Sequence, residues 1–307
     1  MTWNTLVKWM IGNTVRAFAT DVIPNHGFSW QQHYDETIFS FYDVPPVLGF
    51  PVAISNEVQP FASFCSAHTS QPLPADLDSF VNEPTSAGTI LIAFGSICDW
   101  NEAPNATILA FLDVMRSMAD HRFVWGYRGV PLRVPANVRT LAWMPQADLL
   151  RHERTRLFIG HGGMKSLKEV VCAGLPVVYM PLFAEQVYNA WMAVAAGTGE
   201  YVNKFTVTSA SLQATVLKVG CGLVLKNPGY STRARKVRDM WNDAISSPLD
   251  VAAFKVAKLL RWGDRKSLDI RKRWLRPRGA IVPFHQRFHV EQLFITVAFL
   301  KLSTVVL

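Results

Sequence analysis

The feature that most constrains how this chain folds is a glycine-rich turn between an apolar strand and a helix. An apolar run at 157–159 (Leu-Phe-Ile) is followed by Gly-His-Gly-Gly at 160–163 and by a helical pattern at 164–173. Such a junction leaves unpaired backbone N–H groups at the positive end of a helix dipole. It therefore favours the binding of a phosphate or pyrophosphate group.

A second junction of the same kind follows directly. We expect the first helix to end at Gly174, where a left-handed backbone conformation costs little. A strand at 176–180 then leads through Pro181 to Glu185 and Gln186, which open another helix. Because the carboxyl ends of parallel strands meet at one edge of a sheet, both junctions are expected to deliver polar side chains to one ligand site.

Strands alternate with helices over residues 88–245, and half of the 307 residues are hydrophobic, which is enough for a sizeable core. The run at 89–94 is apolar throughout, as in a strand buried on both faces of a parallel sheet. The pattern predicts an α/β domain with a doubly wound parallel sheet. Further strands are expected at 122–127, 137–141 and 222–225, and helices at 104–118, 147–150, 186–196, 209–219, 232–244 and 249–262.

The positive charge of the chain is local. Residues 255–278 contain ten Lys or Arg and two Asp, which equals the net charge of +8 for the whole chain. We interpret this run as a solvated face, with contact to a membrane surface as the alternative. No signature of a nucleic-acid-binding module accompanies it, so we expect no nucleic-acid partner.

Other motifs predict less. The four cysteines are far apart without a C-x-x-C pair, so a thiolate metal site is not expected, and the redox compartment stays open. Asp76-Leu77-Asp78 has the D-x-D spacing of metal-dependent glycosyltransferases, but its position at a helix start favours capping. The glycines at 197 and 199 lack the preceding strand of a dinucleotide fingerprint, and we interpret 197–199 as a helix-ending turn.

The stretch from Trp143 to Gln186 resembles the C-terminal signature of the UDP-glycosyltransferase family, which includes the animal UDP-glucuronosyltransferases and the plant glycosyltransferases. The resemblance extends over residues 71–294, where segments such as TILIAFGS, MPLFAEQVYNA and LRPRG agree with the animal branch. It rests on residues that occur in the family's order and spacing: Trp143, Gln146, His161, Gly162, Gly163, Ser166, Glu169, Pro181 and Gln186.

The resemblance implies a GT-B fold, in which two Rossmann-like domains face each other. This chain would contain the donor domain with an incomplete N-terminal acceptor domain. We expect residues 1–85 to be a remnant of the acceptor domain and a linker, and residues 86–262 to be the UDP-sugar-binding domain. Residues 263–292 form a basic C-terminal extension, and residues 293–307 an apolar tail.

The resemblance also implies roles for base and phosphate contacts. Trp143 would stack on the uracil ring, and Gln146 would lie beside the base or the ribose. The diphosphate would be bound by His161, Gly162, Gly163 and Ser166, with a further contact from Ser96. The residue types alone leave alternatives open: a core tryptophan, a helix N-terminal glutamine, a structural histidine and a turn serine.

Three acidic or amide side chains are implied for the sugars. Glu169 would accept hydrogen bonds from the ribose, or else be a solvated surface residue. Glu185 and Gln186 would bind the transferred sugar, or else provide N-cap chemistry. The chain departs from the family at Lys165, where Asn is usual, and at Glu185, where Asp is usual. These departures leave the donor sugar open.

The implied reaction transfers glucuronate or another hexose from a UDP-sugar to a small lipophilic acceptor with inversion, by a general-base histidine in the acceptor domain. His26, His33 and His68 do not stand in a matching context, so we name no catalytic residue. Neither a cofactor beyond the co-substrate nor a metal is expected. The alternative is a truncated, non-catalytic relative that binds UDP-sugar or pairs with full-length enzymes.

The family resemblance implies a detoxification enzyme in the endoplasmic reticulum membrane. It also implies that copies of the chain can form a homo-oligomer. The first residues have a lysine in their apolar part and no clear cleavage site, so we do not expect a signal peptide. The apolar tail at 293–307 has 15 residues, against the roughly 20 that a span needs. It is either a buried final helix or the first part of a membrane span.

Overall fold

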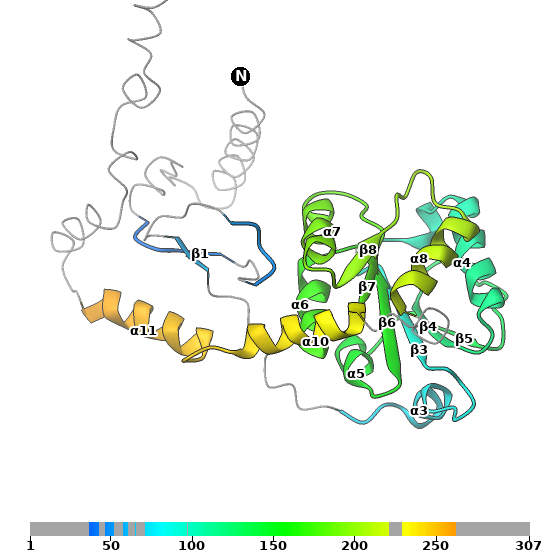
Figure 1. Cartoon of the computed structure of the whole chain (residues 1–307), viewed down its shortest axis with the longest axis horizontal. Helices are drawn as coiled ribbons and strands as arrows, with labels where there is room; N and C mark the ends of the chain where they lie inside the picture. The colour runs from blue at the N-terminus through cyan, green and yellow to red at the C-terminus, as the bar shows by residue number, and fades with distance from the viewer. Residues whose placement is uncertain are drawn as a thin grey trace, which may run out of the picture. The chain divides into compact units, whose positions relative to one another are not determined.

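The computed structural model describes residues 37–42, 47–51, 58–60, 65, 71–96, 98–220 and 229–261 (Figure 1). The chain divides into two compact units. The larger comprises Asp43–Val52 and Pro60–Val251, and the smaller comprises Met1–Tyr42, Ala53–Gln59 and Ala252–Leu307.

The larger unit is built on a six-stranded sheet in which all neighbouring strands are parallel. The strand order is β5-β4-β3-β6-β7-β8, so the chain moves outward from β3 to one edge, returns, and then moves outward from β6 to the other edge. This order is that of a doubly wound Rossmann-like fold. The strands are β3 (Thr89–Ala93), β4 (Arg122–Gly126), β5 (Val138–Leu141), β6 (Thr155–Gly160), β7 (Val177–Tyr179) and β8 (Gly199–Tyr201).

Helices cover both faces of the sheet (Figure 1). Ile90 and Ile92 of β3 pack in one hydrophobic cluster with residues of α4 and α8, and Leu91 packs on the opposite face with residues of α3, α5, α6 and α7. The apolar run at 89–94 is therefore buried on both faces, as predicted. The helices are α3 (Ala75–Val81), α4 (Asn105–Ser117), α5 (Gln146–Arg151), α6 (Met164–Ala173), α7 (Gln186–Ala195), α8 (Ser209–Gly220) and α10 (Gly229–Asn242), with a 3-10 turn at η1 (Trp100–Glu102).

The glycine-rich junction has the predicted form. Strand β6 ends at Gly160, α6 begins at Met164, and the helix ends at Gly174 with a left-handed φ of 68°. The other predicted strands and helices of this unit are confirmed within a few residues at their ends. The exception is the strand expected at 222–225, which lies outside the described residues.

Two sequence interpretations are corrected. Gly197 does end a helix, with φ 65°, but Gly199 begins strand β8, so 197–199 is more than a turn. A β-carbon on Gly199 would lie 2.4 Å from the Val177 carbonyl oxygen, which explains why this close strand pairing needs glycine. The N-cap of α3 is Pro74, without a side-chain hydrogen bond, so Asp76 does not cap the helix but lies in its first turn, where the dipole favours acids.

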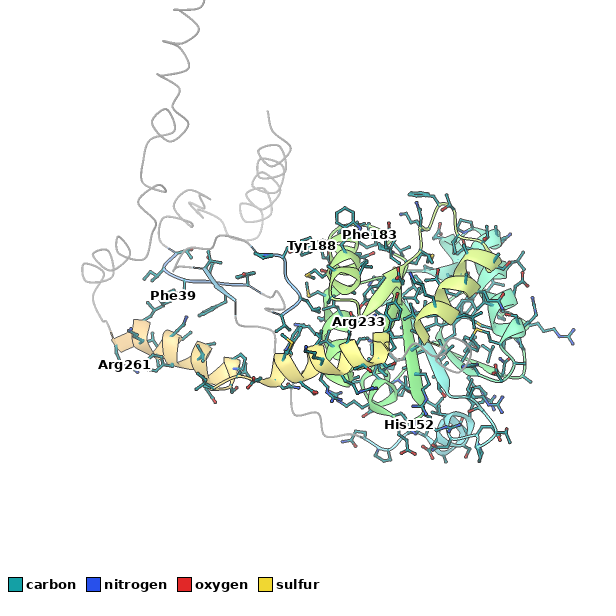
Figure 2. All side chains as sticks on the ribbon, viewed as in Figure 1. Phe39, His152, Phe183, Tyr188, Arg233 and Arg261 are labelled. Carbon is teal, nitrogen blue, oxygen red and sulfur yellow. A yellow bond between two sulfur atoms is a disulfide. The ribbon has the colours of Figure 1, made fainter. Side chains whose placement is uncertain are left out.

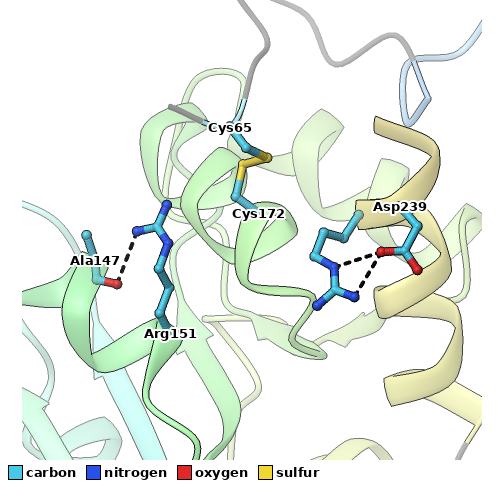
Figure 3. Close-up of a disulfide and its surroundings, with 6 residues drawn as sticks. Cys65, Ala147, Arg151, Cys172 and Asp239 are labelled. Carbon is cyan, nitrogen blue, oxygen red and sulfur yellow. Dashed lines mark hydrogen bonds and ion pairs between the residues drawn. A yellow bond between two sulfur atoms is a disulfide. The ribbon is translucent and has the colours of Figure 1, made fainter. Parts of the chain in front are cut away.

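A disulfide joins Cys65 to Cys172 of α6, across 107 residues of sequence (Figure 3). In the same unit, Leu48 is buried in a cluster with Leu167 and Val171 of α6. The short segment at 47–51 and Cys65 thus pack on the helix that follows the glycine turn. Sequence reasoning left the redox state of the cysteines open, and this pairing resolves it for two of them.

The smaller unit contains β1 (Ser40–Tyr42), which pairs with β2 (Val58–Pro60) in a two-stranded sheet. It also contains most of β2 and most of α11 (Pro248–Arg261). The Lys255 ammonium lies 5.9 Å from the centre of the Phe39 ring, a cation–π contact between the helix and the chain before β1. The basic extension and the apolar tail lie outside the described residues. Within the described part of the chain, no helix combines the length and apolarity needed to cross a membrane.

Candidate functional site

A cavity of about 730 Å³ opens at the carboxyl edge of the sheet, next to the neighbouring strands β3 and β6, after which the chain continues toward opposite edges of the sheet. Open α/β sheets bind ligands at this switch point, and the volume is that of a small-molecule site. All of the predicted site residues except Gly162 line the cavity: Ser96, Trp143, Gln146, His161, Gly163, Ser166, Glu169, Glu185 and Gln186.

The turn from β6 to α6 needs both of its glycines. Gly162 has φ 86°, and a β-carbon there would lie 3.0 Å from the Gln186 carbonyl oxygen. A β-carbon on Gly163 would lie 2.5 Å from His161 Nε2. Gly163 is also the N-cap of α6 and has no side chain, so the N-cap residue does not block the first N–H groups of this helix. These groups form an anion site with the positive end of the dipole.

His161 presents a neutral ring to the cavity. Burial lowers the pKa of its imidazole, against the opposing effects of the Glu185 carboxylate and the Ala93 backbone. Its Nδ1 atom is buried and meets no hydrogen-bond partner of good geometry within the described residues. Since the pKa lies below the ordinary value of about 6.5, the ring at pH 7 acts by hydrogen bonding and not as a cation.

Trp143 is not a core residue. Its side chain is 81% exposed, although it lines the cavity from the loop between β5 and α5. An exposed indole at the wall of a cavity offers a large flat π-face to a ligand ring. The alternative of a buried structural tryptophan is therefore wrong, and stacking on a base remains the prediction.

A hydrogen-bond network connects α5 to α6. The side-chain Nε2 of Gln146 lies 3.1 Å from Ser166 Oγ and 2.6 Å from Glu169 Oε2. Ser166 and Glu169 are one helical turn apart, so both face the same side of α6. Glu169 is thus held by a partner and is not a freely solvated surface residue.

Glu185 and Gln186, at the start of α7, differ in their exposure and in their hydrogen bonds. Glu185 is exposed at the N-cap position without a side-chain capping bond, so N-cap chemistry does not account for it. Gln186 is buried, and its Oε1 accepts hydrogen bonds from the backbone N–H of Leu182 at 2.8 Å and of Phe183 at 3.1 Å. Its carbonyl therefore closes the turn that contains Phe183 (Figure 2), a structural role that sequence reasoning did not find.

This chain is similar in sequence to known proteins. The sequence matches the family described as UDP-glucoronosyl and UDP-glucosyl transferase over residues 14–290. The chain belongs to this family. It is 36% identical over 190 residues to a UDP-glucuronosyltransferase of Pleuronectes platessa, covering 62% of this chain and 39% of that protein. It is 30% identical over 202 residues to human UDP-glucuronosyltransferase 1A9, covering 66% of this chain and 37% of the relative.

Solved glycosyltransferases share the fold. The chain superimposes on the kitacinnamycin glycotransferase with a TM-score of 0.56 and 20% identity, over 71% of this chain and 54% of that one. The spinosyn forosaminyltransferase SpnP gives a TM-score of 0.58 at 16% identity, over 73% and 55% of the two chains. The GT-B type, Rossmann-like fold class is thereby confirmed. The chain spans about two fifths of the length of the UDP-glucuronosyltransferases it matches.

Two further side chains of this UDP-glycosyltransferase chain support the site, and neither was found from the sequence. Asn189 of α7 donates from Nδ2 to the Gly162 carbonyl at 2.7 Å, which holds the glycine turn against α7. The guanidinium of Arg128, after β4, donates to the backbone carbonyl of Ser96. An arginine after the carboxyl end of a parallel strand was the available signal for the second contact.

The departure at Lys165 lies in the cavity wall. Lys165 is exposed in the first turn of α6 and lines the cavity. Lys165 and Arg128 are the two cations among the described lining residues, which also include the acids Asp148, Glu169 and Glu185. The lysine therefore supplies a charge where the family usually has a neutral amide.

Proposed function

We propose that the chain binds UDP-glucuronate or a UDP-hexose in the cavity at the carboxyl edge of the sheet. The observation that carries the proposal is one cavity with an exposed indole, Trp143, and an uncapped helix N-terminus after two required glycines. An aromatic ring and an anion site in one cavity suit a ligand with a flat base and a diphosphate. Membership of the UDP-glycosyltransferase family supports uracil as that base.

Different residues that line the cavity contact different parts of the bound donor. The uracil stacks on Trp143, and the diphosphate accepts hydrogen bonds from the first turn of α6, His161 and Ser166. Glu169 accepts from the ribose hydroxyls, and Glu185 from hydroxyls of the transferred sugar. Gln186 contributes to the sugar end mainly by holding the turn, because its carbonyl is engaged by backbone N–H groups.

The proposed reaction is transfer of the sugar to a small lipophilic acceptor with inversion. The acceptor oxygen forms a bond to the anomeric carbon while the bond from that carbon to the UDP oxygen breaks, and the acceptor proton passes to a base. The N-terminal turn of α6 stabilises the negative charge that develops on the leaving diphosphate. We assign no base, and His26, His33 and His68 lie outside the described residues.

The Cys65–Cys172 disulfide supports a location in an oxidising compartment, because such bonds persist outside the reducing cytosol. It is consistent with the endoplasmic reticulum, the compartment that the family resemblance implies. Attachment to the membrane through residues 293–307 and homo-oligomer formation belong to the same proposal.

Calorimetric titration of the folded chain with UDP tests donor binding. We expect saturable binding of UDP in buffer containing EDTA, and much weaker binding of ADP. Absence of any heat of UDP binding, in a chain shown to be folded by circular dichroism, would contradict the proposal.

Transfer is tested separately from binding. The chain is incubated with radiolabelled UDP-glucuronate or UDP-glucose and a panel of phenols, and labelled product is counted. Turnover by this chain alone would exclude the alternative of a binding-only relative. Saturable UDP binding without turnover would favour that alternative.

The Lys165 side chain is expected to strengthen diphosphate binding as a point charge. Replacing it with the usual residue of the family, Lys165→Asn, should weaken UDP binding about two- to fivefold at low salt, because an exposed charge pair contributes modestly. The difference should shrink as salt screens the charge. Calorimetry at two ionic strengths measures both effects.

The matched control is Lys236→Asn, which removes an exposed lysine of α10 that does not line the cavity. This control should leave UDP affinity unchanged. Equal affinities for the wild-type chain and Lys165→Asn at every salt concentration would show that Lys165 does not act on the ligand.

A further inference from the structure

The amide of Gln146 is oriented by its neighbours. Its Nε2 lies 2.6 Å from Glu169 Oε2 and 3.1 Å from Ser166 Oγ. An ionised carboxylate only accepts hydrogen bonds, so it must face the NH₂ group of the amide and not the carbonyl. Both hydrogens of Nε2 are thereby engaged. Among the residues that the structure describes, no group donates a hydrogen bond to Oε1.

This orientation determines what Ser166 and Glu169 can do. The Ser166 oxygen accepts from Gln146, and its hydroxyl hydrogen makes no other hydrogen bond within the described residues. The hydroxyl is therefore free to donate to an anion such as a phosphate oxygen. Within the described residues, the second carboxylate oxygen of Glu169 accepts no hydrogen bond, so it can accept one from a hydroxyl group of a ligand.

The network thus produces a donor and an acceptor at fixed positions in the cavity. Ser166 is buried and Glu169 is one turn further along the same helix, so both side chains have little freedom once the amide holds them. A side chain fixed in advance loses less conformational entropy when a ligand binds. Gln146, on α5, provides this restraint before the ligand binds.

We infer that Gln146 is a positioning residue that acts through Ser166 and Glu169, and that it makes the site select a ribonucleotide over a 2′-deoxyribonucleotide. The inference rests on the proposed function, because it assigns the acceptor on Glu169 to the ribose of the donor. It differs from a direct contact of Gln146 with the base or ribose, which was the sequence-based expectation.

Calorimetry with UDP and 2′-deoxy-UDP tests the inference on the wild-type chain, Gln146→Leu and Gln146→Glu. Gln146→Leu removes the hydrogen bond that holds the Glu169 carboxylate, and this carboxylate is proposed to accept from the 2′-hydroxyl. The substitution should therefore weaken UDP binding about tenfold. It should weaken 2′-deoxy-UDP binding clearly less, because that ligand lacks the hydroxyl. The selectivity ratio should therefore fall. A purely structural role would lower both affinities by the same factor.

Gln146→Glu separates positioning from direct contact. The new carboxylate faces the Glu169 carboxylate and cannot donate, so positioning predicts at least as large a loss as in Gln146→Leu. A direct contact through Oε1 predicts that the glutamate variant keeps the selectivity of the wild-type chain, since a carboxylate oxygen still accepts from a ribose hydroxyl.

A double-mutant cycle with Glu169→Ala, which removes the accepting oxygens, completes the test. If Gln146 acts through Glu169, Gln146→Leu should cost little more once Glu169 is changed. Additive losses, or retained selectivity in Gln146→Glu, would overturn the inference while UDP binding by the wild-type chain persists. Failure of the wild-type chain to bind UDP would overturn the proposed function, and this inference with it, before any substitution is compared.

Discussion

Replacing Trp143 with alanine is expected to weaken UDP binding about 10- to 100-fold. Stacking of a base on an aromatic side chain contributes about 1–3 kcal/mol, and the alanine variant loses the whole π-face. Because the indole is 81% exposed, its removal should leave the melting temperature of the chain nearly unchanged. Calorimetry with UDP, together with thermal unfolding followed by circular dichroism, measures the two quantities on the same samples.

Two variants control this experiment. Trp143→Phe retains a smaller ring and should recover most of the affinity. Trp191→Ala removes another exposed tryptophan, 55% exposed on α7, which does not line the cavity, and it should have no effect on UDP binding. Full affinity in Trp143→Ala would show that the base binds elsewhere.

Loss of the Cys65–Cys172 disulfide is expected to produce the largest change in stability. The bond closes a loop of 107 residues, and constraint of the unfolded chain by a loop of this length contributes about 3–5 kcal/mol. Cys172→Ser, or reduction by dithiothreitol, should therefore lower the melting temperature by several degrees. Denaturant unfolding of the oxidised and reduced chain measures the difference in free energy.

Cys98 provides the matched control, because it is a free cysteine in the same unit. Cys98→Ser should retain the difference between oxidising and reducing conditions, whereas Cys172→Ser should abolish it. Identical stability of the wild-type chain in both conditions would show that the bond does not hold the segment around Cys65 to α6.

Local rules predicted most of the larger unit. The apolar run at 89–94 predicted a strand buried on both faces. The glycines at 162 and 174 mark positions with positive φ, which other residues rarely adopt. These features depend on neighbours within a few positions in the sequence. The cavity followed from them, because parallel strands bring their carboxyl ends to one edge.

Features that depend on distant residues could not be predicted. Four cysteines allow three pairings, and the sequence does not distinguish them. The bonds from Gln146 to Ser166 and Glu169 join residues 20 and 23 positions apart, and the sequence gives no measure of their distance. The sequence also does not show that the side-chain carbonyl of Gln186 accepts from the backbone of Leu182 and Phe183. The resemblance alone therefore predicted a sugar contact for this residue.

The central claim is that one cavity holds the base and the diphosphate of a UDP-sugar donor. A crystal structure of the chain with UDP tests it most directly. We predict the uracil ring parallel to the Trp143 indole, the diphosphate at the N-terminus of α6 without a bridging metal, and the ribose hydroxyls at Glu169. UDP bound outside this cavity, or bound within it with the base away from Trp143, would contradict the claim.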